Sequence, residues 1–259
     1  MNTKEQKLAA FSRLLDIMDE LREKCPWDMK QNNESIRHLT IEETYELSDA
    51  VLKNDSTEIK KELGDVLLHI IFYARMASEK NEFDIADVCN SLCEKLIVRH
   101  PHIYGDVKVE NAEQVKENWE QIKLKEGNSS VLSGVSKGTP SLIKALRMQE
   151  KAAQVGFDWD TADQVWAKIK EELKELEIEL NKPENNKKSE EEFGDLLFAL
   201  INFARKSNLN PDDALEYTNQ KFLSRFKFIE SRAKTLNKKL NEMTLNEMDE
   251  IWNEAKLSI

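Results

Sequence analysis

The sequence has 259 residues, of which only 7 are glycine and 5 are proline. So few turn-forming residues exclude a β-sandwich, a β-barrel and a multi-stranded α/β sheet, whereas a charged fraction of 34% beside 40% hydrophobic residues suits amphipathic helices. The formal net charge of −11 argues against unspecific binding of nucleic acid or anionic lipid, so neither nucleic acid nor a membrane is expected as a partner. We therefore predict an all-α protein.

Apolar residues recur every three or four positions along most of the chain, which is the spacing of one face of an α-helix. Capping signals support two of the helix starts. Asn210-Pro211 is typical of an N-cap followed by proline at the first helical position, and Thr244 and Glu247 have the spacing of a capping box. The predicted helices span residues 5–24, 36–53, 56–80, 84–99, 111–126, 141–155, 161–181, 188–207, 211–235 and 244–257.

A polar stretch that holds three of the seven glycines divides the chain near its middle. It predicts a linker over residues 127–140, an N-terminal helical domain over 1–126 and a C-terminal helical domain over 141–259. The two parts repeat each other in the same order, which predicts an internal duplication. The matching blocks are Trp27-Asp28 with Trp159-Asp160, Glu42-Glu43-x-x-Glu46 with Glu171-Glu172-x-x-Glu175, residues 62–75 with 192–205, Lys95-x-x-x-Arg99 with Lys221-x-x-x-Arg225, and Trp119 with Trp252.

Carboxylates are spaced for a metal site in both parts. Glu43 and Glu46 share one helix face, and Glu62 and Asp65 share a face of the next helix. Antiparallel packing of the two helices would bring four carboxylates into one pocket, where their repulsion favours a hard cation such as Mg²⁺. An isolated Glu-Glu-x-x-Glu is commonly a solvated face, but its repetition in both parts favours the metal site. The second part repeats the pattern with Glu172, Glu175, Glu192 and Asp195.

One glycine precedes the aspartate of each pattern, in the interior of a predicted helix. Glycine at such a position costs about 1 kcal/mol relative to alanine. Gly64 and Gly194 therefore predict close packing of the opposing helix.

The carboxylate pattern resembles the signature of the MazG family of nucleoside triphosphate pyrophosphohydrolases. The resemblance covers essentially the whole chain and is greatest to the two-domain form with tandem units. It extends to Cys25-Pro-Trp-Asp28, Arg99-His-Pro-His102 and Gly156-Phe-Asp-Trp159. It implies two tandem helical-bundle domains, a homodimer, and Mg²⁺-dependent hydrolysis of nucleoside and deoxynucleoside triphosphates between the α and β phosphates, yielding the monophosphate and pyrophosphate.

The resemblance also implies that the C-terminal unit carries the activity, and its lysines agree with this. Lys168 and Lys188 stand where the first part has Leu39 and Glu58, and they would help to bind a triphosphate. The resulting catalytic and metal-binding candidates are Glu172, Glu175, Glu192 and Asp195. The nucleotide- and phosphate-binding candidates are Lys168, Glu171, Lys188, Glu191, Lys221, Arg225, Trp252 and Lys256. A second, weaker metal site is expected at Glu43, Glu46, Glu62 and Asp65.

Several alternatives stay open from the sequence. By resemblance Trp252 would meet the base, but its spacing fits a core tryptophan equally well, and Trp159 and Trp166 are interpreted as packing residues. The protein could instead be a helical regulatory or scaffold protein whose acidic clusters bind metal or a partner, or a pyrophosphatase restricted to dUTP or dCTP.

The expected location is the cytoplasm. The first residues have no hydrophobic signal core, and an odd number of cysteines, three, suits a reducing compartment better than a disulfide framework.

Overall fold

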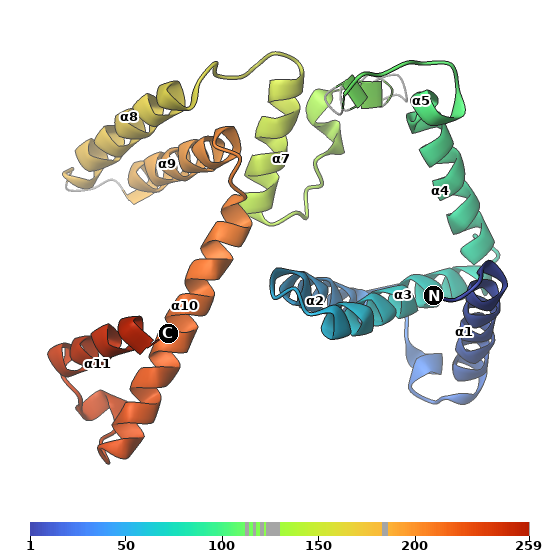
Figure 1. Ribbon diagram of the computed structural model, residues 1–259, viewed down its shortest axis with the longest axis horizontal. Coiled ribbons are helices and arrows are strands. Elements are labelled where there is room, and N and C mark those ends of the chain that lie inside the picture. The colour runs from blue at the N-terminus through green and yellow to red at the C-terminus, as the bar shows by residue number, and fades with distance from the viewer. Residues whose placement is uncertain (112–113, 116–117, 120–121, 123–129, 183–185, 259) are drawn as a thin grey trace. The chain divides into compact units, whose positions relative to one another are not determined.

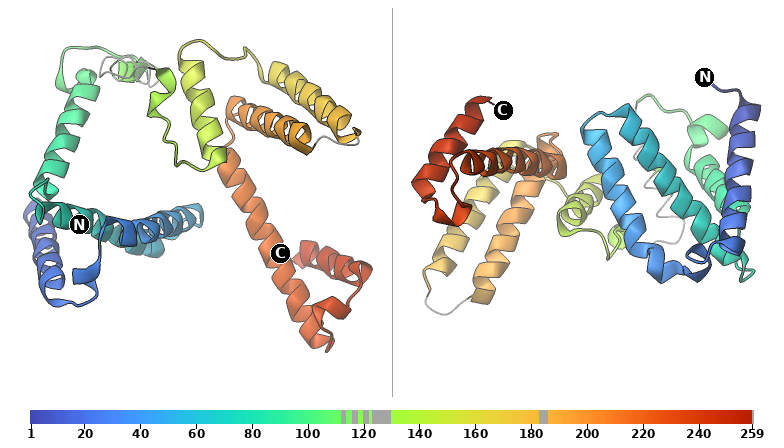
Figure 2. Two further views of the ribbon diagram at one scale, coloured as in Figure 1. Left: turned by 180° about the vertical axis from the view of Figure 1, so that it is seen from behind. Right: turned by 90° about the horizontal axis from the view of Figure 1, so that it is seen from below.

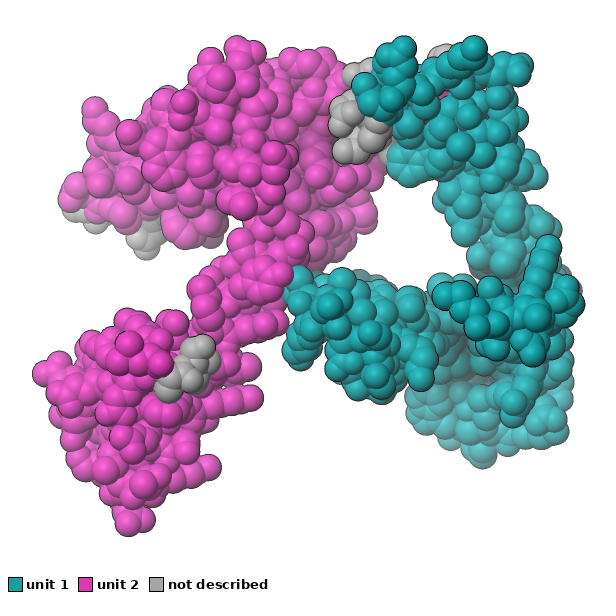
Figure 3. Space-filling model, viewed as in Figure 1, with its two compact units in different colours: residues 1–119 teal, residues 120–259 magenta. Residues whose placement is uncertain are grey.

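A computed structural model describes residues 1–111, 114–115, 118–119, 122, 130–182 and 186–258 (Figure 1). These residues form helices and loops without a β-strand, which confirms the predicted all-α class. The chain divides into two compact units, residues 1–119 and 120–259 (Figure 3). The helix predicted over 111–126 and the first residues of the predicted linker, 127–129, lie largely outside the described residues.

The first unit is built on a helical hairpin. Helices α2 (Asn33–Leu52) and α3 (Ser56–Ser78) run antiparallel, and α1 (Lys4–Lys24) packs on α3 (Figures 1 and 2). Helices α4 (Ile85–Arg99) and α5 (Pro101–Tyr104) follow, and a 3-10 turn, η1 (Asp28–Lys30), precedes α2. The core of this unit consists of the buried side chains Met18, Ile36, Ile71, Phe72 and Met76.

The second unit repeats this hairpin. Helices α8 (Ala162–Leu180) and α9 (Asn186–Lys206) pack along each other, and α7 (Ser141–Gln154) packs on α9 (Figure 2). Helices α10 (Pro211–Thr235) and α11 (Leu245–Ser258) pack together around Ile229, Ala233, Met243 and Ile251. Two 3-10 turns, η2 (Val131–Gly134) and η3 (Leu240–Glu242), lie in the connections.

The helix starts follow the capping chemistry in the sequence. The Asn210 side chain accepts hydrogen bonds from the backbone of Asp212 and Asp213, and Pro211 is the first residue of α10. Thr244 and Glu247 exchange backbone-to-side-chain bonds of 2.8 and 3.3 Å, which confirms the capping box. Helix α2 begins three residues earlier than predicted, because Asn32 caps it.

The duplication is visible in matched side-chain contacts. The Arg99 guanidinium lies 5.6 Å from the centre of the Trp119 ring, and the Arg225 guanidinium lies 5.4 Å from the centre of the Trp252 ring. Both pairs come from aligned positions of the two units. The repeated sequence blocks therefore adopt similar local structures.

Gly64 and Gly194 differ from the expectation. A Cβ atom built at either position would meet no other atom within 4 Å. The prediction that the opposing helix packs closely on these glycines was therefore wrong within a single chain. Separately, none of the described helices combines the length and the apolar character needed to cross a bilayer.

Candidate active site

Each helical hairpin brings three carboxylates together. In the second unit, carboxylate oxygens of Glu172 from α8 and of Glu192 and Asp195 from α9 all lie within 4.8 Å of one another. We call this group the second acidic cluster. The first acidic cluster, formed by Glu43 from α2 and by Glu62 and Asp65 from α3, meets the same limit.

The fourth carboxylate predicted for each cluster lies outside that limit. Glu46 and Glu175 are exposed. Both still act on their clusters at longer range. Desolvation, followed by the charge of Glu175, raises the pKa of Glu192, and desolvation, followed by the charges of Asp65 and Glu46, raises the pKa of Glu43.

Lys168 belongs to the second acidic cluster, as the sequence indicated. Its Nζ atom lies 2.7 Å from a carboxylate oxygen of Glu171 and 2.7 Å from one of Glu172, and these hydrogen bonds raise the pKa of Lys168. Glu172 is almost completely buried, and the positive charge of the lysine offsets the cost of burying its carboxylate. Lys188 and Glu191 are exposed on α9, and the described part of the chain offers Lys188 no ion pair.

The first acidic cluster also contains a lysine, which the sequence comparison missed. Lys61 Nζ lies 2.8 Å from Glu62 Oε1, and Glu62 is only 3% exposed. The sequence contrast, in which Lys168 and Lys188 of the second unit replace Leu39 and Glu58 of the first, is therefore weaker than predicted. The first cluster has a lysine as well, at position 61. The available signal was Lys61 itself, which aligns with Glu191 in the second part.

The donor chemistry of both clusters fits a divalent metal. Each presents carboxylate oxygens, which are the ligands that hard cations take. In the first cluster, Glu62 Oε2 is buried and has no hydrogen-bond partner among the described residues. An unpaired buried carboxylate oxygen is costly, and a cation would satisfy it.

A cleft of about 640 Å³ adjoins the second acidic cluster. Helices α7, α8 and α9 and the loop between α7 and α8 form its walls, and these include Lys168, Glu172 and Asp195. The remaining lining is largely apolar and aromatic, with polar groups at a few positions. This composition and size are typical of small-molecule sites, which measure about 300–1,000 Å³.

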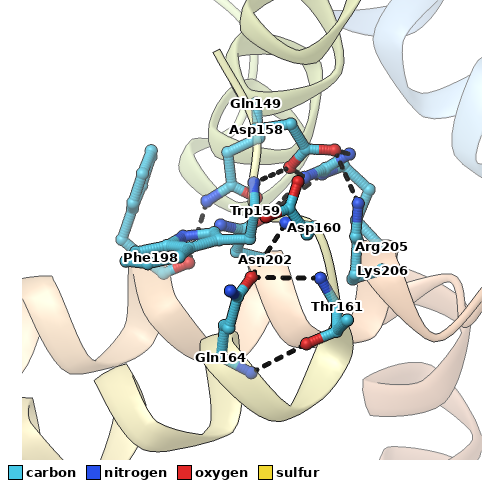
Figure 4. Close-up of polar contacts among 10 residues, drawn as sticks. All are labelled: Gln149, Asp158, Trp159, Asp160, Thr161, Gln164, Phe198, Asn202, Arg205 and Lys206. Carbon is cyan, nitrogen blue, oxygen red and sulfur yellow. Dashed lines mark hydrogen bonds and ion pairs between the residues drawn. The ribbon is translucent and has the colours of Figure 1, made fainter. Parts of the chain in front are cut away.

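The loop between α7 and α8 is held against α9 by one carboxylate. Asp158 accepts hydrogen bonds from both terminal nitrogens of Arg205 and from Lys206 Nζ at 3.0 Å (Figure 4). Burial alone would raise the pKa of Asp158, but the bonds to Arg205 and Lys206 outweigh it and lower that pKa. The next residue, Trp159, lines the cleft and is 42% exposed, so its ring is accessible to a ligand there as well as packed in the loop.

Trp166 contacts Phe203, with 5.1 Å between the ring centres, but it is 45% exposed. Of the two tryptophans, Trp159 in the loop lines the cleft and Trp166 on α8 does not. The sequence alone gave no sign that a cleft opens beneath that loop.

The remaining predicted nucleotide-binding residues form a separate group on α10 and α11. Trp252 packs against Arg225 and lies 5.3 Å from Phe222 between ring centres. Lys256 Nζ donates to Asn253 at 3.0 Å, and Lys221 is exposed. None of these residues lines the cleft beside the second acidic cluster.

Comparisons with known proteins agree on one family. A sequence model described as the MazG nucleotide pyrophosphohydrolase domain matches residues 31–104. The chain is 42% identical over 251 residues to the nucleoside triphosphate pyrophosphohydrolase/pyrophosphatase MazG of Thermotoga maritima, covering 95% of both chains. It is 39% identical over 254 residues to a nucleoside triphosphate pyrophosphohydrolase of Escherichia coli, covering 95% of this chain and 97% of that protein.

Among solved structures, the crystal structure of a mazG-related protein from Thermotoga maritima aligns with 44% of this chain and 98% of its own. The sequence identity is 28% and the TM-score is 0.39.

Proposed function

The chain belongs to the MazG family of nucleotide pyrophosphohydrolases, and we propose that its second unit holds the main active site. The protein is an enzyme that hydrolyses nucleoside triphosphates to the monophosphate and pyrophosphate, as the names of its full-length relatives state for those proteins. The alternative of a regulatory or scaffold protein is not needed to explain the acidic clusters.

The observation that carries the assignment to the second unit is the cleft. Its walls include Lys168, Glu172 and Asp195, so a ligand in it would contact the acidic cluster and a cation together. In the first unit, a smaller cleft of about 220 Å³ is lined by Met18, Arg75 and neighbouring residues, and none of its lining residues belongs to the first acidic cluster. A nucleotide whose phosphates bind the metal needs a cleft for its remaining parts directly beside the acidic cluster.

The residues that would hold the metal are Glu172, Glu192 and Asp195, together with Glu175. Oxygen ligands alone favour Mg²⁺ among the common divalent cations. When bound, Mg²⁺ polarises the α-phosphate and neutralises charge on the departing pyrophosphate.

The protein's own groups bind the substrate and accept the proton. Water adds to the α-phosphorus, the bond from that phosphorus to the bridging oxygen breaks, and pyrophosphate leaves with that oxygen. A carboxylate of this group that the metal does not saturate would take the proton of the attacking water. Lys168, which lines the cleft beside Glu172, would donate to a phosphate oxygen.

Further phosphate and nucleotide contacts are assigned to residues around this centre. Glu171 orients Lys168 through its 2.7 Å contact, while the exposed Lys188 and Glu191 lie on α9 near the cluster. The separate group on α10 and α11, which lines no part of the cleft, is assigned further contacts to the phosphates and ribose. Its members are Lys221, Arg225, Trp252 and Lys256.

The protein is proposed to form a homodimer through its helical hairpins. On α8, Trp166, Leu173 and Leu180 stand seven residues apart, which places them on one helix face, and they are 45–64% exposed. On α9, Phe193, Leu197 and Leu200 follow helical spacing and are 41–51% exposed. Apolar stripes of this kind on paired helices mark protein–protein contacts, and a second copy would cover them.

The location proposed for the enzyme is the cytoplasm. All three cysteines are free thiols, and Cys89 and Cys93 are exposed on α4. Exposed free thiols persist best in a reducing compartment.

Product analysis tests the proposed function. Purified protein with Mg²⁺ and each of the common and damaged triphosphates should release pyrophosphate and not orthophosphate. Release from most of them supports a broad enzyme, whereas release from dUTP or dCTP alone supports the narrow alternative. No pyrophosphate from any triphosphate contradicts the proposal.

A further inference from the structure

The cleft of the second unit contains a buried amide with an unused acceptor. Gln149 on α7 is only 5% exposed, and its Nε2 donates to the Phe198 carbonyl at 2.8 Å (Figure 4). Because that carbonyl can only accept, the bond fixes the orientation of the amide. Gln149 Oε1 is buried and accepts no hydrogen bond from the described residues. A buried acceptor without a partner is costly, so the site is suited to a ligand that donates a hydrogen bond.

A second amide lines the same cleft from α9. Asn202 Oδ1 accepts hydrogen bonds from Arg205 Nε at 3.1 Å and Nη2 at 2.7 Å, which orients the Asn202 amide. Its Nδ2 donates to no residue in the described part of the chain, and Asn202, like Gln149, is part of the cleft wall. One acceptor and one donor therefore converge on the cleft from two helices.

The first unit fills the corresponding space with side chains. Asn202 aligns with Phe72, which is 4% exposed and packs with Met18 in the core. Ala199 aligns with His69, a buried ring whose Nδ1 lies 2.7 Å from Thr40 Oγ1. The second unit thus has an amide and a methyl group where the first has two rings. Open space beside a core lowers stability, so its presence beside the acidic cluster points to a ligand.

Aromatic surface completes the cleft. Trp159 lines it from the loop that Asp158 ties to Arg205 and Lys206. An indole face stacks on any nucleobase with little discrimination.

We propose that this cleft is the nucleobase pocket of the active site, in which Gln149 Oε1 accepts a hydrogen bond from a base N–H and Trp159 contacts the face of the base. The phosphates then extend toward Lys168 and the second acidic cluster. This proposal rests on the proposed function and adds the site at which the nucleobase of the substrate is bound. All common bases carry an N–H donor, so the pocket accepts purines and pyrimidines but disfavours a base without such a donor.

Gln149→Met tests the hydrogen bond, since it keeps the side-chain length and removes the acceptor. With Mg²⁺, the KM for ATP should rise about tenfold while kcat stays within about threefold. The KM for purine riboside triphosphate, whose base has no N–H, should be the same in the variant and in the unmodified protein. Gln154→Met, at an exposed position of the same helix, is the matched control and should change neither constant.

Trp159→Ala provides a second test that does not depend on Gln149. It should raise the KM for both triphosphates, because stacking does not require an N–H, whereas Trp27→Ala at the aligned position of the first unit should not. If Gln149→Met changes the KM equally for both substrates, or changes neither KM, the proposed hydrogen bond to Gln149 is wrong. If Trp159→Ala leaves the KM unchanged, the proposed nucleobase pocket is wrong.

Failure of the proposed function is distinguishable from failure of the pocket. If the unmodified protein releases no pyrophosphate from any triphosphate, the reaction assignment fails. The pocket is then tested with adenosine, whose binding should change the tryptophan fluorescence of the protein but not that of Trp159→Phe. Absence of any adenosine-dependent change in the unmodified protein would overturn the pocket as well.

Discussion

Lys168 Nζ lies 2.7 Å from a carboxylate oxygen of Glu172, the most buried member of the second acidic cluster. The ion pair holds a cation at the place where a metal would bring its own charge. Lys168 also lines the cleft, so its ammonium group would be available to the phosphates of a bound nucleotide. The same side chain therefore pairs with a buried carboxylate in the free protein and is proposed to bind substrate phosphate.

Removing the Lys168 charge should affect nucleotide and metal in opposite directions. In Lys168→Met, the KM for MgATP is expected to rise about tenfold, because a charged donor to phosphate is lost. Binding of Mg²⁺ without nucleotide should be equal or tighter, because the cluster becomes more negative. Isothermal titration calorimetry with Mg²⁺ and steady-state kinetics measure the two effects. Lys170→Met, at an exposed position of the same helix, should show neither, and weaker Mg²⁺ binding in Lys168→Met would contradict the argument.

The two acidic clusters are expected to contribute unequally to the reaction. Glu172→Gln should lower kcat by about two orders of magnitude or more, since it removes a metal-binding charge beside the cleft. Glu43→Gln, at the aligned position, should lower it by less than about threefold. Pyrophosphate release at saturating Mg²⁺ gives both values, and the reverse order would assign the main site to the first unit.

Much of this arrangement was predictable from the sequence, for identifiable reasons. Helical spacing and capping residues are local signals, so α10 and α11 began within one residue of their predicted starts. The clusters followed from spacing on two paired helices. The cleft could not be predicted from the sequence, because its walls are formed by residues far apart in the chain, among them Ala199 and Asn202. The missing hydrogen-bond partner of Gln149 Oε1 is likewise visible only in the folded structure.

The tie between Asp158 and Arg205 should matter for substrate as well as for stability. Asp158→Asn weakens charge-assisted bonds worth about 1–3 kcal/mol and loosens the loop that carries Trp159. We expect a lower Tm and a KM for ATP raised several-fold. Asp19→Asn weakens the 2.5 Å contact with Arg75, the residue aligned with Arg205, and should lower stability while leaving the KM unaffected. Equal KM effects in both variants would rule out a specific role for the loop.

The stabilisation of the fold by the capping interactions at the start of α11 should decrease at acidic pH. Bonds from Lys238 and from the Thr244 backbone lower the pKa of Glu247 to about 2, against an ordinary value of 4.5. A carboxyl whose pKa is lower in the folded protein stabilises the fold above its unfolded pKa, and this stabilisation is lost as pH falls from 4.5 toward 2. Urea denaturation at pH 6 should therefore distinguish the unmodified protein from Glu247→Gln, and the difference should disappear near pH 2. A difference that persists unchanged at pH 2 would assign the effect to packing.

Gly194 gives a direct test of the proposed homodimer. Within one chain a Cβ at this position meets nothing within 4 Å, so Gly194→Ala should stabilise an isolated chain by about 1 kcal/mol through helix propensity. If α9 of a second copy packs closely on this glycine, the added methyl group instead separates the two helices. We expect the homodimer outcome, in which sedimentation shows weakened self-association and the Tm becomes more dependent on protein concentration. Gly64→Ala makes the same test in the first unit. A higher Tm without any change in assembly would show that no second copy covers Gly194.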